Sequence, residues 1–262
     1  MSAGDGGQPP FAEQAAQTMA VLQAFTPVLQ ELGVAELAQQ TGLPQAVVAS
    51  IARTLCELGH LRLEPGSKRY RLGPALVTIA RNFLGGRGVR AHARGHMEAL
   101  ATRFRAPVAL TERDGTEMVY LEYVRGEAPV VVQHRVGTRL PLARSAAGRA
   151  WLAGAPAPLA DVVRRQLAAQ LHREWQQLEP RLDAAREDLR QLGFTRSYGD
   201  LQPEVNSAAV PFTSPVDGLL LVFSIAAPSM LAPAKRFDAE LGPALVEMVG
   251  KVKAELEAGA RP

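Results

Sequence analysis

"TGLPQAVVASIARTLCELG", residues 41–59, joins a short polar turn to a long helix with one apolar face. Pro44 falls in the first turn of that helix, where Pro is favoured, and Gly59 falls just past its end. The spacing of the apolar residues predicts a buried stripe made of Val48, Ile51, Ala52, Leu55 and Leu58. A turn followed by such a helix is typical of the second half of a helix-turn-helix.

Two further helices are predicted upstream of this stretch. The first covers residues 11–25 and ends before Pro27, and its apolar residues at helical spacing are Ala15, Met19, Leu22 and Phe25. The second covers residues 34–40 and ends at Gly42, a residue type suited to the position after a helix. Its inward residues are Val34, Leu37 and Ala38. Together the three helices give the helix-turn-helix its expected framework.

Residues 60–73, "HLRLEPGSKRYRLG", predict a small hairpin. Apolar and polar residues alternate on either side of Pro65-Gly66, the apolar ones being Leu61, Leu63, Tyr70 and Leu72. Pro followed by Gly suits the two central positions of a type II turn. A hairpin directly after a helix-turn-helix is the wing of a winged helix domain.

Charge is distributed unevenly along the chain. Residues 1–50 carry four acids and no base, whereas residues 51–105 carry eleven cations and three acids, a net charge of +8. Such a basic block is the expected footprint of a phosphate-binding surface, although a solvated face of an Arg-rich chain has the same composition. The exposed face of the third helix carries one cation, so the wing is expected to supply much of the phosphate contact. The predicted DNA-binding residues are Gln45, Ala46, Ala49, Ser50, Arg53, Arg62, Lys68, Arg69 and Arg71.

The second half of the chain changes from helical to strand periodicity near Val108. The predicted elements are a hairpin over 108–124 turning at Asp114-Gly115, a strand at 129–134, a short helix at 144–154, an amphipathic helix at 181–193, strands at 207–212 and 219–227, and a terminal helix at 233–258. The amphipathic helix is expected to bury Leu182, Ala185, Leu189 and Leu192. An antiparallel sheet with helices on its faces is an α+β domain of the sensor type.

The basic segment at 74–105 reads as mostly helical, with a break expected at Gly85-Gly86. A length of 262 residues fits about two domains. We therefore expect a disordered tail over residues 1–10, a winged helix-turn-helix domain over 11–75, a linker helix over 76–95 and a second domain over 96–262.

Several classes of protein are disfavoured. No apolar run approaches the roughly 18–20 residues needed to cross a membrane, and the N-terminus lacks the basic region of a signal peptide. The single cysteine, Cys56, cannot form an internal disulfide, which fits a reducing cytoplasm. His92 and His96 have the spacing of a metal pair, but a solvated helix face explains them better because no third ligand is near. Ser145 lies in no nucleophile elbow. We expect a cytoplasmic protein that contacts no membrane, holds no metal or cofactor and is not an enzyme.

The order of elements and several motifs resemble the IclR family of bacterial transcriptional regulators, from Met19 to about Pro228. The motifs are residues 41–61, "YRLG" at 70–73, "GTRLPLARSAAGRAWLAG" at 137–154, "LRQLGF" at 189–194 and "AAVPF" at 208–212. The resemblance implies a winged helix-turn-helix domain joined by a linker helix to a GAF/profilin-like α+β domain that binds a small effector. The chain departs from the family pattern where Ser50 replaces a longer polar residue and Ala46-Val47 replace Ser-Thr.

The resemblance also implies an effector site lined by Ala146, Ala147, Ser197, Ser207, Ser224 and Ala226. "SAAG" at a helix start offers free backbone N–H groups to a carboxylate, and the serines offer hydroxyls. The alternative is that these small residues only permit close packing of a helix on a sheet. Arg144 and Arg196 are further candidates for pairing with an anion. The expected ligand is a small organic acid, or an aromatic molecule with one polar end.

The leading hypothesis is a transcriptional regulator that binds a double-stranded DNA operator under the control of this effector. One recognition helix reads few bases, so a homodimer or homotetramer on a symmetric site is expected. The alternative is a small-molecule-binding regulatory protein with a degenerate DNA-binding domain. This alternative is supported by the absence of any Lys or Arg before Arg53 on the exposed face of the third helix.

Overall fold

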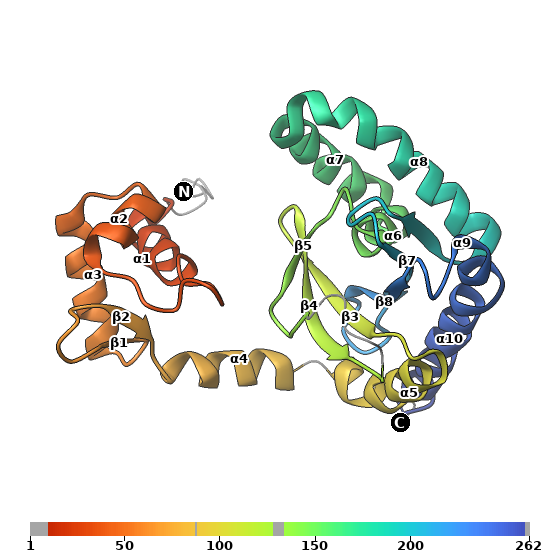
Figure 1. Ribbon diagram of the computed structural model, residues 1–262, viewed down its shortest axis with the longest axis horizontal. Helices are drawn as coiled ribbons and strands as arrows, with labels where there is room; N and C mark the ends of the chain where they lie inside the picture. Colours follow the sequence, from red (N-terminus) through yellow and green to blue (C-terminus); the bar gives the residue numbers. More distant parts are fainter. Residues whose placement is uncertain (1–9, 87, 128–133, 260–262) are drawn as a thin grey trace, which may run out of the picture. The chain divides into compact units, whose positions relative to one another are not determined.

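The computed structural model describes residues 10–86, 88–127 and 134–259. The chain divides into two compact units, Met1–Gly86 and Arg87–Pro262, which are described separately (Figure 1). The predicted tail lies outside the described residues except for Pro10. No described helix is long and apolar enough to cross a membrane.

The first unit holds three helices, a two-stranded hairpin and a fourth helix. The elements are α1 (Glu13–Gln23), α2 (Val34–Thr41), α3 (Gln45–Glu57), β1 (Leu61–Leu63), β2 (Tyr70–Leu72) and α4 (Ala75–Gly85). The core packs side chains of all three first helices against the hairpin, including Val21, Leu37, Val48, Leu55 and Leu61. Gly42 and Gly66 have φ of 70° and 89°, as the predicted helix end and type II turn require. The predicted winged helix-turn-helix is therefore confirmed.

Three residues of the predicted apolar stripes of this unit are exposed instead, namely Ala15, Met19 and Leu58. In α1, Val21 takes the buried position, and Met19 lies on the solvent side of the helix. Leu58 follows the last residue of α3 and is 60% exposed, because the backbone leaves the helical path there to reach Gly59. The remaining four residues of the predicted α3 stripe are buried.

The second unit is an antiparallel sheet of six strands in the order β5-β4-β3-β8-β7-β6. The strands are β3 (Val108–Asp114), β4 (Glu117–Val124), β5 (Arg139–Pro141), β6 (Thr195–Tyr198), β7 (Val205–Thr213) and β8 (Leu220–Pro228). The hairpin β3–β4 turns at Gly115-Thr116, one residue later than predicted, because Asp114 and Glu117 still pair. The predicted strand at 129–134 lies outside the described residues except for His134.

Helices cover both faces of this sheet (Figure 1). One face packs against α6 (Ala146–Gly154), which is backed by α7 (Ala157–Leu171) and α8 (Trp175–Leu192). The other face packs against α5 (Gly88–Phe104) and α10 (Gly242–Gly259). The predicted terminal helix starts as α9 (Ala234–Arg236) and passes through one π-helical turn at Phe237–Leu241 before α10. The unit is α+β, as predicted.

The sequence missed three elements of the second unit. Strands β5 and β6 have three and four residues, too few for an alternating pattern to stand out. Helix α7 has an apolar side that includes Ala160, Val163 and Leu167 and packs on the core beneath α6. In α8, Leu182 and Ala185 are buried as predicted, but Leu192 is exposed at the last turn before Gly193.

Candidate nucleic-acid interface and ligand cavity

The predicted reading face of α3 is on the surface. Gln45, Ala46, Ser50 and Arg53 are exposed and Ala49 is half-buried. The side chain of Arg53 is 82% exposed, and its one ion-pair partner in the described part of the chain is Glu57, one turn further along the same helix, at 3.1 Å. An exposed pair of this kind contributes little to stability, so Arg53 is free to exchange Glu57 for another partner.

The four cations of the wing fall into two pairs with different surroundings. Arg69 donates through Nη2 to Glu36 (2.8 Å) and to the Glu31 carbonyl oxygen (2.9 Å). Arg71 forms ion pairs with the carboxylates of Glu31 and Glu64. Both arginines therefore tie the hairpin to the segment around α2.

Glu36 is held from two sides. The Gly33 N–H donates to it at 2.7 Å, at the start of α2, and Arg69 pairs with it from the wing. The hydrogen bond from Gly33, followed by that from Arg69, lowers the pKa of the Glu36 carboxyl below its usual value. Glu36 therefore keeps the negative charge that neutralises Arg69 down to a lower pH than an ordinary glutamate would.

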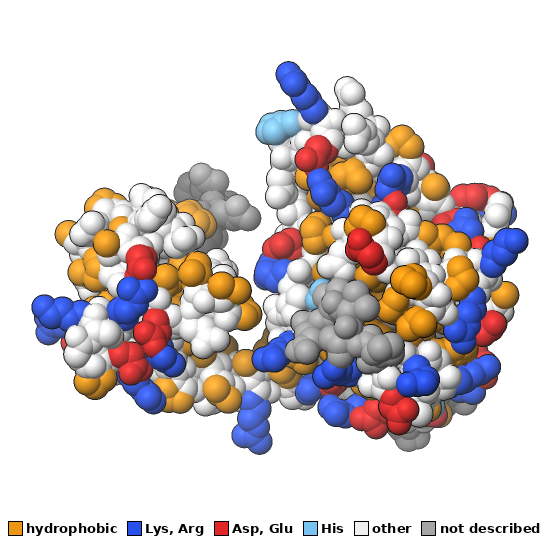
Figure 2. Space-filling model, in the orientation of Figure 1, with side chains coloured by type: hydrophobic (Ala, Val, Ile, Leu, Met, Phe, Trp, Pro, Cys, Tyr) orange, Lys and Arg blue, Asp and Glu red, His pale blue; other side chains and the backbone are white. Residues whose placement is uncertain are grey.

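Arg62 and Lys68 differ from the other wing cations. Both are exposed, and neither forms an ion pair among the residues that the structure describes. Figure 2 shows Lys and Arg side chains of the first unit (blue) interspersed with Asp and Glu side chains (red). The basic block found in the sequence is thus partly neutralised by acids from the preceding segment, and Arg62 and Lys68 are the wing cations left to attract phosphate.

A cavity of about 90 Å³ lies in the second unit, where the start of α6 faces the sheet. All six residues expected to contact an effector line it, namely Ala146, Ala147, Ser197, Ser207, Ser224 and Ala226. This volume is well above the roughly 10–15 Å³ that a cavity needs to hold one water, so the cavity has room for a small ligand. The chain thus brings together residues that are up to eighty positions apart in sequence.

The start of α6 supplies unused backbone donors to the cavity. The Ser145 hydroxyl caps the helix by accepting the Gly148 N–H at 3.1 Å. Among the described residues, no hydrogen bond involves the N–H groups of Ala146 or Ala147. Two free N–H groups at the positive end of a helix dipole can bind a carboxylate.

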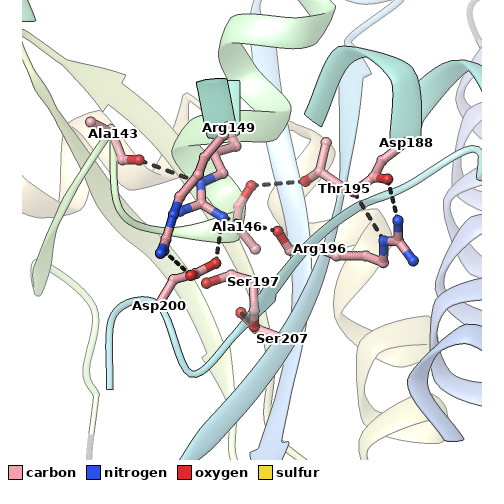
Figure 3. A network of polar contacts seen from close by, with 10 residues as sticks. Ala143, Ala146, Arg149, Asp188, Thr195, Arg196, Ser197, Asp200 and Ser207 are labelled. Atoms are coloured by element: carbon pink, nitrogen blue, oxygen red, sulfur yellow. Dashed lines mark hydrogen bonds and ion pairs between the residues drawn. The ribbon is translucent and has the colours of Figure 1, made fainter. Parts of the chain in front are cut away.

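Hydroxyl groups from the strands face the same space. The Ser207 hydroxyl of β7 donates to the Ser197 carbonyl oxygen at 3.4 Å, and Figure 3 shows both residues close together beside the start of α6. Ser224 lies on β8, where it pairs with Ala209 of β7. These hydroxyl groups can donate a hydrogen bond to a polar substituent of a ligand or accept one from it.

Sequence reasoning missed an aromatic wall of the cavity. Tyr120 and His134 stack with ring centroids 5.0 Å apart and 19° between their planes. Tyr123 meets the Tyr120 ring edge to face at 5.7 Å. Burial raises the pKa of both tyrosines and lowers that of His134, so all three rings are neutral near pH 7. The isolated position of His134 in the sequence gave no sign of this stack.

Arg125 is the cationic side chain among the described lining residues, and it is exposed at the cavity. The two arginines considered from sequence lie elsewhere. Arg144 pairs with Glu174, and Arg196 pairs with Asp188 at 2.5 Å and with Asp238 at 3.5 Å. Neither lines the cavity, and both are held by acids from the turn before α8, from α8 itself and from the π-helical turn before α10.

The histidine pair on α5 has separate local partners. His92 Nδ1 lies 2.9 Å from the Gly88 carbonyl oxygen, and His96 Nε2 lies 2.9 Å from Glu255 of α10. Within the described ranges, no cluster of three or more His, Cys, Asp or Glu side chains could hold a metal ion. Cys56 is half-buried in α3, and burial raises the pKa of its thiol.

Each of the two units matches a known protein family. Residues 15–65 match the IclR helix-turn-helix domain, and residues 82–254 match the family described as bacterial transcriptional regulator IclR C-terminal. The chain is 33% identical over 233 residues to the HTH-type transcriptional regulator TsaQ1/TsaQ2 of Comamonas testosteroni, covering 88% of this chain and 84% of that protein.

Solved structures have the same architecture. The crystal structure of an IclR family transcriptional regulator from Brucella abortus superposes with a TM-score of 0.83 at 33% identity, over 94% of this chain and 93% of that one. An IclR homologue from Microbacterium hydrocarbonoxydans, solved in complex with 4-hydroxybenzoate, superposes with a TM-score of 0.73 at 21% identity, over 94% and 99% of the two chains.

Proposed function

We propose that this chain, which belongs to the IclR family of bacterial transcriptional regulators, binds operator DNA through its first unit and a small organic acid through its second. The acid binds in the cavity at the start of α6 and changes the affinity for the operator. The observation that carries the proposal is the meeting of all six expected residues around one cavity whose wall includes the start of α6, where the N–H groups of Ala146 and Ala147 form no hydrogen bond among the described residues.

The cavity chemistry favours an aromatic carboxylate. The stacked rings of Tyr120 and His134 offer an apolar, planar wall to a ring of similar size. The N–H groups of Ala146 and Ala147, or the guanidinium of Arg125, are suitable partners for the carboxylate. The Microbacterium homologue was solved with 4-hydroxybenzoate, and a ligand of that size and chemistry also suits this cavity.

On the DNA side, α3 lies in the major groove with Arg53 reading a guanine and Gln45 reading a neighbouring base. Arg62 and Lys68 of the wing contact phosphates, since the structure gives them no competing ion pair among the described residues. Arg69 and Arg71 act indirectly by holding the hairpin against the α2 segment.

One α3 helix can contact only a few base pairs, so we expect the chain to bind DNA as a symmetric assembly. Helix α4 has no buried residue, and Val77, Ile79 and Phe83 expose apolar surface along it. We propose that the side of α4 that carries Ile79 and Phe83, which lie four residues apart, packs against a second copy of the chain, so that two α3 helices meet successive half-sites of one operator, in a homodimer or homotetramer.

Calorimetric titration of the full chain with 4-hydroxybenzoate, benzoate and an aliphatic acid tests the ligand site. Ala147→Trp should fill the cavity and remove binding, whereas Ala169→Trp, on the exposed side of α7, should leave it unchanged. Because Ala147 is buried, Ala226→Leu provides a milder test from the opposite wall, and circular dichroism checks that each variant is folded. Wild-type affinity in both cavity variants would show that the ligand binds elsewhere.

A second candidate is a small-molecule-binding protein whose first unit no longer binds DNA. It is favoured by the internal ion pairs of Arg69 and Arg71, which halve the number of wing cations available for phosphate. Fluorescence anisotropy with duplex DNA at increasing salt separates the two functions. Affinity that falls steeply with salt supports the regulator, and no binding at low salt supports the second candidate.

A further inference from the structure

A buried ion pair lies directly behind the cavity wall. Arg149 of α6 is 3% exposed, and its Nη1 donates to Asp200 Oδ2 at 2.6 Å and to the Arg196 carbonyl oxygen at 3.3 Å. Its Nε donates to the Ala143 carbonyl oxygen at 3.4 Å (Figure 3). Asp200 also pairs with Arg181, a half-exposed residue of α8.

Asp200 belongs to the loop at 199–204, which joins β6 to β7. The two residues that follow it, Leu201 and Gln202, line the cavity. The loop is tight, because the Gly199 N–H donates to Val205 O and the Val205 N–H donates to Gln202 O, both at 3.0 Å. A shift of Asp200 therefore moves the wall that Leu201 and Gln202 form.

Arg149 stands one turn after the free N–H groups of α6. The Arg149–Asp200 pair consequently joins two walls of the cavity, the helix start and the β6–β7 loop, and Arg181 joins both to α8. A guanidinium this deeply buried needs a charged partner. Among the described residues its one carboxylate partner is Asp200. The ion pair therefore has two states. It is formed when the loop is in place, and it is broken when the loop is displaced.

We infer that Asp200 is a positioning residue for the ligand: with Arg149 and Arg181 it holds the 199–204 loop in the closed position that completes the cavity. This inference rests on the ligand site proposed above. The occupied cavity and the closed loop stabilise each other, because a ligand that contacts Leu201 or Gln202 binds only the closed form. If loss of the pair leaves the loop closed in about one molecule in ten, the apparent Kd rises about tenfold.

The test compares Asp200→Asn with Asp188→Asn in the full chain. The two carboxylates are matched, since their side chains are 19% and 15% exposed and each pairs with arginine. Asp188 pairs with the Arg196 side chain, on the other side of β6 from Arg149 in Figure 3, and does not line the cavity. Asp200→Glu keeps a carboxylate for Arg149 and serves as the conservative variant.

Hydrogen exchange of the amides at residues 199–205 in the unliganded protein is the first measurement. We expect exchange about tenfold faster in Asp200→Asn than in the wild type, and wild-type exchange in Asp188→Asn, at a temperature where thermal melts show every variant folded. Equal exchange in Asp200→Asn and the wild type would overturn the inference. If Asp200→Asn does not fold, Arg181→Gln loosens the same loop without leaving a buried charge unpaired, and the same comparison decides.

Calorimetry with 4-hydroxybenzoate is the second measurement. We expect Kd to rise about tenfold in Asp200→Asn and to return to within about threefold of the wild type in Asp200→Glu. Unchanged affinity in Asp200→Asn would contradict the positioning role even if the loop exchanged faster. If the wild type binds none of the acids tested, the proposed ligand site fails, and the exchange measurement still decides whether Asp200 holds the loop.

Discussion

Lys68→Ala and Arg69→Ala each remove one positive charge from the same hairpin, yet we expect them to change DNA binding differently. Lys68 is exposed and has no ion pair among the described residues. Arg69 pairs with Glu36 and donates to the Glu31 carbonyl oxygen, so it would have to abandon both to reach a phosphate. Charge alone predicts that the two substitutions have the same effect.

The salt dependence of binding gives the expected magnitudes. Each phosphate contact contributes about 0.9 to the slope of log K against log salt, so Lys68→Ala should flatten the slope by about 0.9 and Arg69→Ala by about 0. Over a fourfold rise in salt, the factor by which affinity falls should be about 3.5 times smaller for Lys68→Ala than for the wild type. For the double variant, residue charges alone predict a loss of about 2 in slope, and the ion pair of Arg69 reduces this expectation to about 1.

The assay is fluorescence anisotropy of a labelled random-sequence duplex at several salt concentrations, with Arg62→Ala as a control that should behave like Lys68→Ala. The hydrogen bond from Gly33 is the largest cause of the lowered pKa of Glu36 and remains in Arg69→Ala, so this variant should raise that pKa only part of the way toward its ordinary value, and it should destabilise the first unit because the Arg69–Glu36 pair is lost. An equal loss of slope in Arg69→Ala and Lys68→Ala would refute the reasoning, because Arg69 would then leave Glu36 to bind phosphate. If Lys68→Ala leaves the slope of log K against log salt unchanged, the turn between β1 and β2 does not contact DNA.

Three further outcomes are expected. Arg53→Ala should cost about 1–3 kcal/mol in operator binding and relax preference at one base pair, and a wild-type selection profile at every base would point to recognition of DNA shape instead. Burial lowers the pKa of His134 below 6.5, so folding disfavours its protonated form and the free energy of unfolding should fall as the pH drops below that value. In urea unfolding across about pH 5–8, the free energy of unfolding should depend less on pH in His134→Phe than in the wild type. Identical pH profiles of the two proteins would contradict this. Gly148→Ala should destabilise the second unit by about 1–3 kcal/mol or more, because a Cβ there would overlap the backbone of Leu142. Gly250→Ala, in the middle of α10 with nothing within 4 Å of the new Cβ, should stabilise it by roughly 0.5–1 kcal/mol, and similar thermal melts for both variants would refute the packing argument.

Local pattern alone determined most elements of the chain. The helices of the first unit, the wing, the hairpin β3–β4 and the pair β7–β8 each carry a periodicity or a turn residue within a short window, such as Gly42 after α2 or Gly66 in the wing. The cavity residues are a different case, since the family resemblance, and not any spacing, named the six that meet there. Strands β5 and β6 were not predicted from the sequence, because they are short and gain their stability from neighbouring strands.

The partners of the charged and aromatic side chains were decided only by the tertiary structure. Nothing near Arg69 in the sequence indicates that Glu36 neutralises it, and nothing near Arg149 indicates that it is buried against Asp200. Tyr120 and His134 likewise become a cavity wall only when β4 and the segment after it come together. The physical reason is that hydrophobic periodicity records which face of an element is buried, whereas an ion pair or a ring stack depends on the positions of two residues that the fold brings together from distant parts of the chain.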